Sequence, residues 1–180
     1  MGCLTSGRLR TCGTGTTGGA KWVYLADIQT IDKVATEASR AVDGSYPTVT
    51  MVNPVTDFFY KFTGKRNTIN INESLTVVDG NSSSVLTITI VFDNSTQADK
   101  VIIDELKNCV CGLSAIWCDN SGNTKISSLI DSEELLLATG VRDTGTAKAD
   151  PNQTTLTFTA EMACFADAYT GDEASIPKAP

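Results

Sequence analysis

The chain has 180 residues, of which 41% are hydrophobic and 19% charged, with a net charge of −7. This size and apolar content suit one globular domain with a sizeable core. The acidic balance excludes electrostatic attraction to nucleic acid. The first twenty residues lack the apolar run of a secretory signal, and the apolar cluster at 135–138 is too short to span a bilayer.

The first third of the chain begins with a Gly- and Thr-rich stretch, residues 1–20, which we expect to be a flexible arm. A strand is predicted at 21–26 (KWVYLA). Residues 27–41 are mixed, with a few apolar residues at helical spacing but at low density. Two shorter strands are predicted at 48–52 and 58–62.

Four later stretches alternate apolar and polar residues. A period of two places alternate side chains on opposite faces of a sheet, so each stretch is predicted to be a strand with one buried and one exposed face. The stretches are 68–77, 85–92, 110–118 and 155–164. Their apolar faces consist of Ile69, Ile71, Leu75 and Val77; Leu86, Ile88, Ile90 and Phe92; Cys111, Leu113, Ala115 and Trp117; and Leu156, Phe158, Ala160, Met162 and Cys164.

Turn and cap signals connect these strands. Asp79-Gly80-Asn81 predicts a tight hairpin between the first two, because Gly and Asn tolerate positive φ. A helix is predicted over 96–108, capped by Ser95 or Thr96, and 119–123 is predicted to be the loop of a second hairpin. The apolar stripe of the helix comprises Ala98, Val101, Ile102 and Leu106.

The last third is predicted to contain a polar loop at 139–153, a strand at 154–165 and an extended or mobile segment at 166–180. We therefore divide the chain into an arm (1–20), one β-rich domain (21–168) and a C-terminal tail (169–180). The fold class expected is mainly β: an antiparallel β-sandwich or small β-barrel with one flanking α-helix.

Short motifs near the N-terminus are not taken as binding sites. Gly13, Gly15 and Gly18 match the dinucleotide fingerprint, but that motif must precede a helix, and a strand is predicted here. Residues 1–6 match an N-myristoylation pattern, which leaves a lipid-anchored protein as an alternative. The six cysteines show no C-x-x-C pair, and we favour reduced thiols over a disulfide framework.

Catalytic chemistry has few candidate residues. The chain contains no histidine, so no Ser-His or Cys-His couple exists. Glu73 interrupts an apolar strand face; it either points outward at a bulge or is buried beside Lys or Arg, and we favour the outward orientation. We expect no enzyme activity, no cofactor, no metal and no small-molecule substrate.

The order of these parts resembles the tail tube fold of long-tailed bacteriophages. The matching parts are the hairpin of 68–93, the helix of 96–108, the hairpin of 110–128 and the strand of 154–165. Short phrases near 3–25 and 115–123 are also similar to the start and the later part of some phage structural proteins. The resemblance implies a virion tail subunit, assembled in the host cytoplasm, whose six copies close into a ring through which DNA passes.

The resemblance and the strand pattern together define candidate residues. The partners expected are copies of the chain itself, other tail or connector proteins and transiently passing DNA, with no membrane. The candidates for subunit contacts are Asp79, Gly80, Asn81, Ser82, Trp22, Tyr24 and Pro177, and those for the lumen face are Asn70, Asn72, Thr76, Thr87 and Thr89. The alternatives are a head-decorating or adhesin-like binding module, a lipid-anchored membrane-surface domain and a nucleotide-binding enzyme.

Overall fold

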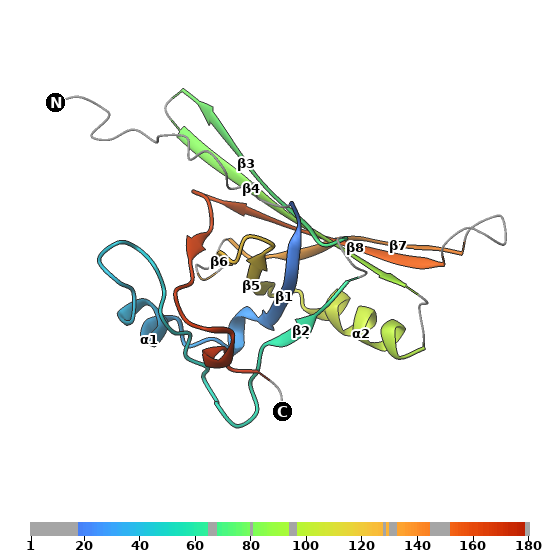
Figure 1. Ribbon diagram of the computed structural model, residues 1–180, viewed down its shortest axis with the longest axis horizontal. Helices are drawn as coiled ribbons and strands as arrows, with labels where there is room; N and C mark the ends of the chain where they lie inside the picture. The colour runs from blue at the N-terminus through green and yellow to red at the C-terminus, as the bar shows by residue number, and fades with distance from the viewer. Residues whose placement is uncertain are drawn as a thin grey trace.

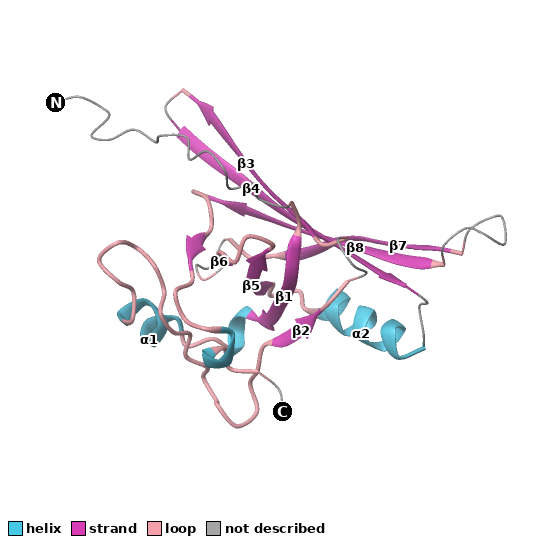
Figure 2. Cartoon of the chain, in the orientation of Figure 1, coloured by secondary structure: helices cyan, strands magenta, loops and turns pink. Residues whose placement is uncertain are grey.

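The computed structural model describes residues 18–64, 68–79, 81–93, 97–127, 129, 133–144 and 152–178. It is a β-sandwich of two antiparallel sheets with a flanking helix, which confirms the fold class expected from the sequence (Figures 1 and 2). Residues 1–17 of the expected arm lie outside the described residues, and with them Cys3, Cys12 and the N-terminal motifs except Gly18. The cap candidates Ser95 and Thr96 and the turn residue Gly80 also lie outside them.

One sheet has five strands in the order β2-β1-β5-β6-β9. At its centre, β1 pairs with β5, and both strands are buried along nearly their whole length. The bounds are β1 Ala20–Asp27, β2 Tyr60–Phe62, β5 Leu113–Asp119, β6 Thr124–Ser127 and β9 Asp167–Ala168.

The other sheet has four strands in the order β3-β4-β8-β7. The expected hairpin joins β3 and β4 in continuous register from Asn70↔Thr89 to Val78↔Asn81. Asp79 occupies the turn with a φ of 51°, the left-handed conformation that such a tight turn requires. The bounds are β3 Asn70–Val78, β4 Asn81–Asp93, β7 Leu136–Asp143 and β8 Gln153–Met162.

The main core lies between the two sheets. Its residues from β4 and β8 confirm the alternation predicted for those strands, because each strand has one buried and one more exposed face. Among the buried side chains are Leu86, Ile88, Ile90, Leu156, Phe158, Ala160 and Met162 from the four-stranded sheet, and Val23, Leu25, Leu113, Ala115 and Trp117 from the five-stranded sheet.

A second core covers the far face of the five-stranded sheet, and no periodic pattern in the sequence predicts it. Residues between β1 and β2 and the segment after β8 pack over this face. The prediction of a half-exposed strand at 110–118 is therefore wrong: β5 is buried on both faces, and Cys111 lies in the preceding turn, exposed. Members of this cluster include Trp22, Tyr24, Tyr46, Met51, Phe59, Ile116, Tyr169 and Ile176.

The predicted helix exists as α2, Gln97–Asn108. Its contact with the core is narrower than the stripe predicted from the sequence. Leu106 is buried and Ile103 packs against the main core, whereas Val101 and Ile102 remain 50% and 41% exposed. A second helix, α1 (Lys33–Ala38), begins at Asp32, whose carboxylate accepts the amide of Ala35.

Three sequence predictions are wrong in the loops and tail. The segment 48–52 forms one isolated bridge, Ile31↔Met51, rather than a strand. The first residues of the predicted loop 139–153 belong to β7, which pairs with β8 through Asp143. The segment after β8 is not an extended tail that begins at 169: it contains β9 and the 3-10 helix η2 (Glu173–Ser175), and Tyr169 and Ile176 are buried.

Gly112 offers a test of the tight connection between α2 and β5. Its φ is +87°, and a Cβ there would lie 2.2 Å from the Cβ of Glu134. Gly122 has a similar φ of +93° with nothing within 4 Å of a new Cβ. We expect Gly122→Ala to cost about 1–2 kcal/mol of backbone strain and Gly112→Ala roughly 3 kcal/mol or more in urea unfolding. Equal costs would contradict the packing described for Gly112.

Candidate assembly interface

The β3–β4 hairpin extends beyond the body of the protein (Figure 1). β8 pairs with β4 only as far as Ser84↔Met162, so the ribbon beyond Ser84 consists of two strands. Leu75 and Val77 on its inner face are 45% and 62% exposed. The apolar alternation predicted for 68–77 therefore continues past the core, and the hairpin carries apolar side chains that the described chain leaves about half exposed.

Glu73 fixes the base of this hairpin. Its side chain is 13% exposed, one carboxylate oxygen accepts a bond from the ammonium of Lys125 at 2.5 Å, and the other accepts the amide of Ala166 at 2.7 Å. The outward orientation that we favoured is wrong, because the carboxylate points inward and joins β3 to β6 and to the segment after β8. An ion pair and a backbone bond thus hold the hairpin at a defined angle to the body.

The outer face of the four-stranded sheet is rich in uncharged polar residues. All five lumen-face candidates lie on it: Asn70 pairs with Thr89, Asn72 with Thr87, and Thr76 lies nearer the turn. β8 continues the same rows with Thr157 and Thr159 opposite Thr89 and Thr87. The alternation places Asp93, Asp143 and Glu161 on this face as its described charges, and all three are acidic.

The two edges of this sheet are long. β3 and β7 each pair with one neighbour in the described part of the chain. Open backbone donors and acceptors along an edge strand pair readily with another chain. Two features limit aggregation through these edges. β7 has a bulge between Leu137 and Thr139, and β3 has the inward carboxylate of Glu73.

Three of the subunit-contact candidates serve the chain's own interior. Trp22 and Tyr24 are 8% and 2% exposed in the second core, so they present little area to another copy. The Pro177 carbonyl accepts the amide of Phe59 at 2.7 Å. The segments that cover Trp22 and Tyr24 have no periodic pattern, so the sequence did not indicate that these side chains are buried. Asp79, Asn81 and Ser82 do lie exposed at the hairpin tip.

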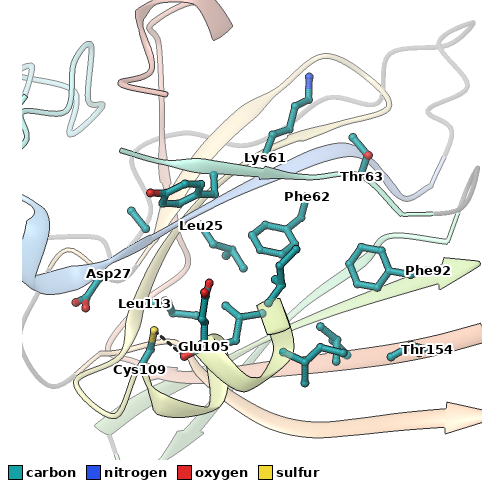
Figure 3. Close-up of a pocket in the computed structure, with 16 residues that line it drawn as sticks. Leu25, Asp27, Lys61, Phe62, Thr63, Phe92, Glu105, Cys109, Leu113 and Thr154 are labelled. Atoms are coloured by element: carbon teal, nitrogen blue, oxygen red, sulfur yellow. Dashed lines mark hydrogen bonds between the residues drawn. The ribbon is translucent and has the colours of Figure 1, made fainter. Parts of the chain in front are cut away.

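An apolar groove of about 520 Å³ separates α2 from β2 and from the ends of β4 and β8 (Figure 3). The groove was not predicted from the sequence, in which Ile103 and the aromatic run before residue 63 were the signals that could have indicated it. Its lining includes Leu25, Phe62, Phe92, Ile103, Leu106 and Leu156. Figure 3 shows Phe62 and Phe92 from opposite sheets facing the space above α2.

Carboxylates lie at one end of this groove. Asp27 and Glu105 line it beside Cys109, whose thiol donates to the Glu105 carbonyl at 3.4 Å. Burial, and then the negative charges of Asp27 and Glu105, raise the pKa of the Cys109 thiol. This end of the groove therefore disfavours anions and favours a cation.

The described residues contain no group of three or more His, Cys, Asp or Glu side chains placed to hold a metal ion. Within those residues, no helix has the length and apolar character to cross a membrane. The described cysteines, Cys109, Cys111, Cys118 and Cys164, are free thiols.

A scan against protein-family models and searches of curated proteins and of solved structures found no match to this chain. The resemblance to tail tube proteins therefore stays a prediction from the sequence.

Removing the hairpin anchor tests the role of Glu73. Glu73→Ala leaves the Ala166 amide without this acceptor and Lys125 without this partner, so we expect a loss of about 1–3 kcal/mol in unfolding free energy. Amide hydrogen exchange in β3 should also accelerate. Glu161→Ala, at an exposed position of β8, is the control and should change neither measurement. Unchanged exchange in β3 would show that the anchor does not hold the hairpin.

Acid should loosen the C-terminal segment through Glu173. The carboxylate accepts bonds from Lys61 at 2.6 Å and from the Tyr24 hydroxyl at 2.9 Å, and the Lys61 bond is the main cause that lowers its pKa below 4.5. Because the folded pKa is depressed, this stabilisation is present above 4.5 and is lost as pH falls through the folded value. Trp22, whose ring lies 5.9 Å from the Lys61 ammonium, should report the change by fluorescence. Glu173→Gln should remove this pH-dependent change in Trp22 fluorescence. An identical curve of fluorescence against pH in the variant would show that Glu173 is not the group responsible.

Proposed function

We propose that this protein is a non-enzymatic virion structural protein, a tail tube or tail-ring subunit whose copies assemble into a hexameric ring around a channel for DNA. The observation that carries the proposal is the β3–β4 hairpin, which projects from the body with Leu75 and Val77 exposed. An exposed apolar face on an anchored two-stranded ribbon is stabilised when another copy buries it. Six-fold closure comes from the family resemblance of the sequence alone.

The long edges of the four-stranded sheet support the same proposal. β3 and β7 lie at its two edges, so a head-to-tail arrangement brings the β3 edge of one copy to the β7 edge of the next. Such pairing satisfies the open backbone groups of both strands. Closure into a ring leaves no edge free, which removes the tendency to aggregate.

The outer face of the four-stranded sheet supports the proposed channel. Its rows of Thr and Asn carry acidic charges and no described cation, by the alternation given above. A surface of this kind does not attract the phosphate backbone, so DNA passes without being held. We therefore assign Asn70, Asn72, Thr76, Thr87 and Thr89 to the channel wall in this proposal.

Assembly at high protein concentration tests the proposal. Val77→Lys places a charge on the hairpin and should raise the concentration needed for assembly by about tenfold or more. Val52→Lys is the control, since Val52 is also 62% exposed but lies away from the four-stranded sheet. Negative-stain images should show six-fold rings or tubes for the unmodified chain and for the control. Monomers or trimers of the unmodified chain at every concentration would overturn the proposal and favour a decorating or adhesin-like module.

A further inference from the structure

The groove beneath α2 combines an apolar floor with an acidic end. Phe62, Ile103 and Leu106 contribute to the floor, and Asp27 and Glu105 supply the carboxylates. Lys61, the described cation of the lining, is held by Glu173 at 2.6 Å and lies over the rings of Trp22 and Tyr24. Figure 3 shows its side chain directed away from Glu105. The groove therefore fits a short apolar segment that carries positive charge.

The chain itself contains such a segment. Residues 1–17 include Leu4, Arg8, Leu9 and Arg10 and no Asp or Glu. In an extended peptide, Leu9 points to the side opposite Arg8 and Arg10, so a leucine can enter an apolar floor while guanidinium groups meet carboxylates. We propose that the groove binds residues 4–10 of a second copy of this chain. The proposal rests on the proposed function, since it names a surface that joins neighbouring copies.

A second copy fits better than the same copy. β1 begins at Ala20, and Leu25 and Asp27, near its other end, line the groove, so the two ends lie roughly 24 Å apart. β1 lies between β2 and β5 and is buried on both faces along nearly its whole length, so an arm that returned to the groove of its own copy would have to pass over these neighbouring elements. Residues 4–10 lie 8 to 14 positions before Gly18, a tether of about 26–50 Å when extended, which is enough to enter an adjacent subunit.

The hairpin tip is a weaker occupant of the groove. It is apolar at Leu75 and Val77, but its charged residue is Asp79, which the carboxylates of Asp27 and Glu105 would repel. The arm is positively charged and so complements the two carboxylates of the groove.

Disulfide trapping in the full-length chain tests the proposal. Cys109 lines the groove, and the arm contains Cys3 and Cys12. We would mix ¹⁵N-labelled and unlabelled protein before assembly and oxidise with diamide, which takes two hydrogens from each thiol pair. Mass spectrometry of the digest should then show Cys3 or Cys12 of one isotopic form joined to Cys109 of the other.

Charge reversal provides the matched comparison. Glu105→Lys should reduce the yield of the mixed peptide by roughly tenfold, because it replaces an attraction to arginine with a repulsion. Glu161→Lys makes the same change on the outer face of β8 and should leave the yield unaltered. The proposal is overturned by arm cysteines joined equally to Cys109, Cys111 and Cys164, by links within one isotopic form only, or by equal losses in both variants.

The same samples separate this inference from the proposed function. Six-fold rings in negative stain without the link between the arm and Cys109 would overturn the arm site and leave the ring proposal standing. The mixed link without rings would support the arm site and contradict the ring.

Discussion

Burial of both faces of the five-stranded sheet is the constraint on which the rest of the molecule depends. β1 places Val23 and Leu25 in the core between the sheets and Trp22 and Tyr24 in the core beneath the covering segments. Those covering segments pack on the far face of the five-stranded sheet and do not cover the outer face of the four-stranded sheet. Its inner face closes the main core, while Leu75 and Val77 of the overhanging hairpin stay largely exposed and Ser82 donates a hydrogen bond to the Ala163 carbonyl at 3.3 Å. The hairpin and the outer face of the four-stranded sheet therefore remain exposed, and these are the surfaces proposed for assembly.

The strands that border one core and solvent were predictable from the sequence. β4 and β8 alternate over their length because a pleated sheet turns successive side chains to opposite environments. β7 was missed because Gly140 and Asp143 have low strand propensity, and only pairing with β8 places them in a sheet. The second core was missed because Tyr46, Phe59 and Ile176 come from segments without periodicity.

The candidate site was predictable to the extent that it depends on alternation. The shared face of Asn70, Asn72 and Thr87 follows directly from it. The orientation of Glu73 does not, because its partner Lys125 lies 52 positions away in the sequence. The groove beneath α2 could not be predicted from the sequence either. α2 turns Ile103 and Leu106 toward the sandwich but leaves Val101 and Ile102 largely outside, a tilt that helical periodicity does not determine.

The second core, which contains both Trp22 and Ile176, constrains the order of events during synthesis. The second core joins residues that lie far apart in the sequence, and Tyr169 pairs with Tyr46 in the same cluster. Contacts of such long sequence separation form only after the intervening chain is available. On the ribosome, the aromatic floor beneath β1 therefore stays open until translation has passed Ile176. Completion of the second core, which lies beneath the sheet that carries β1, therefore depends on the synthesis of residues 169–176.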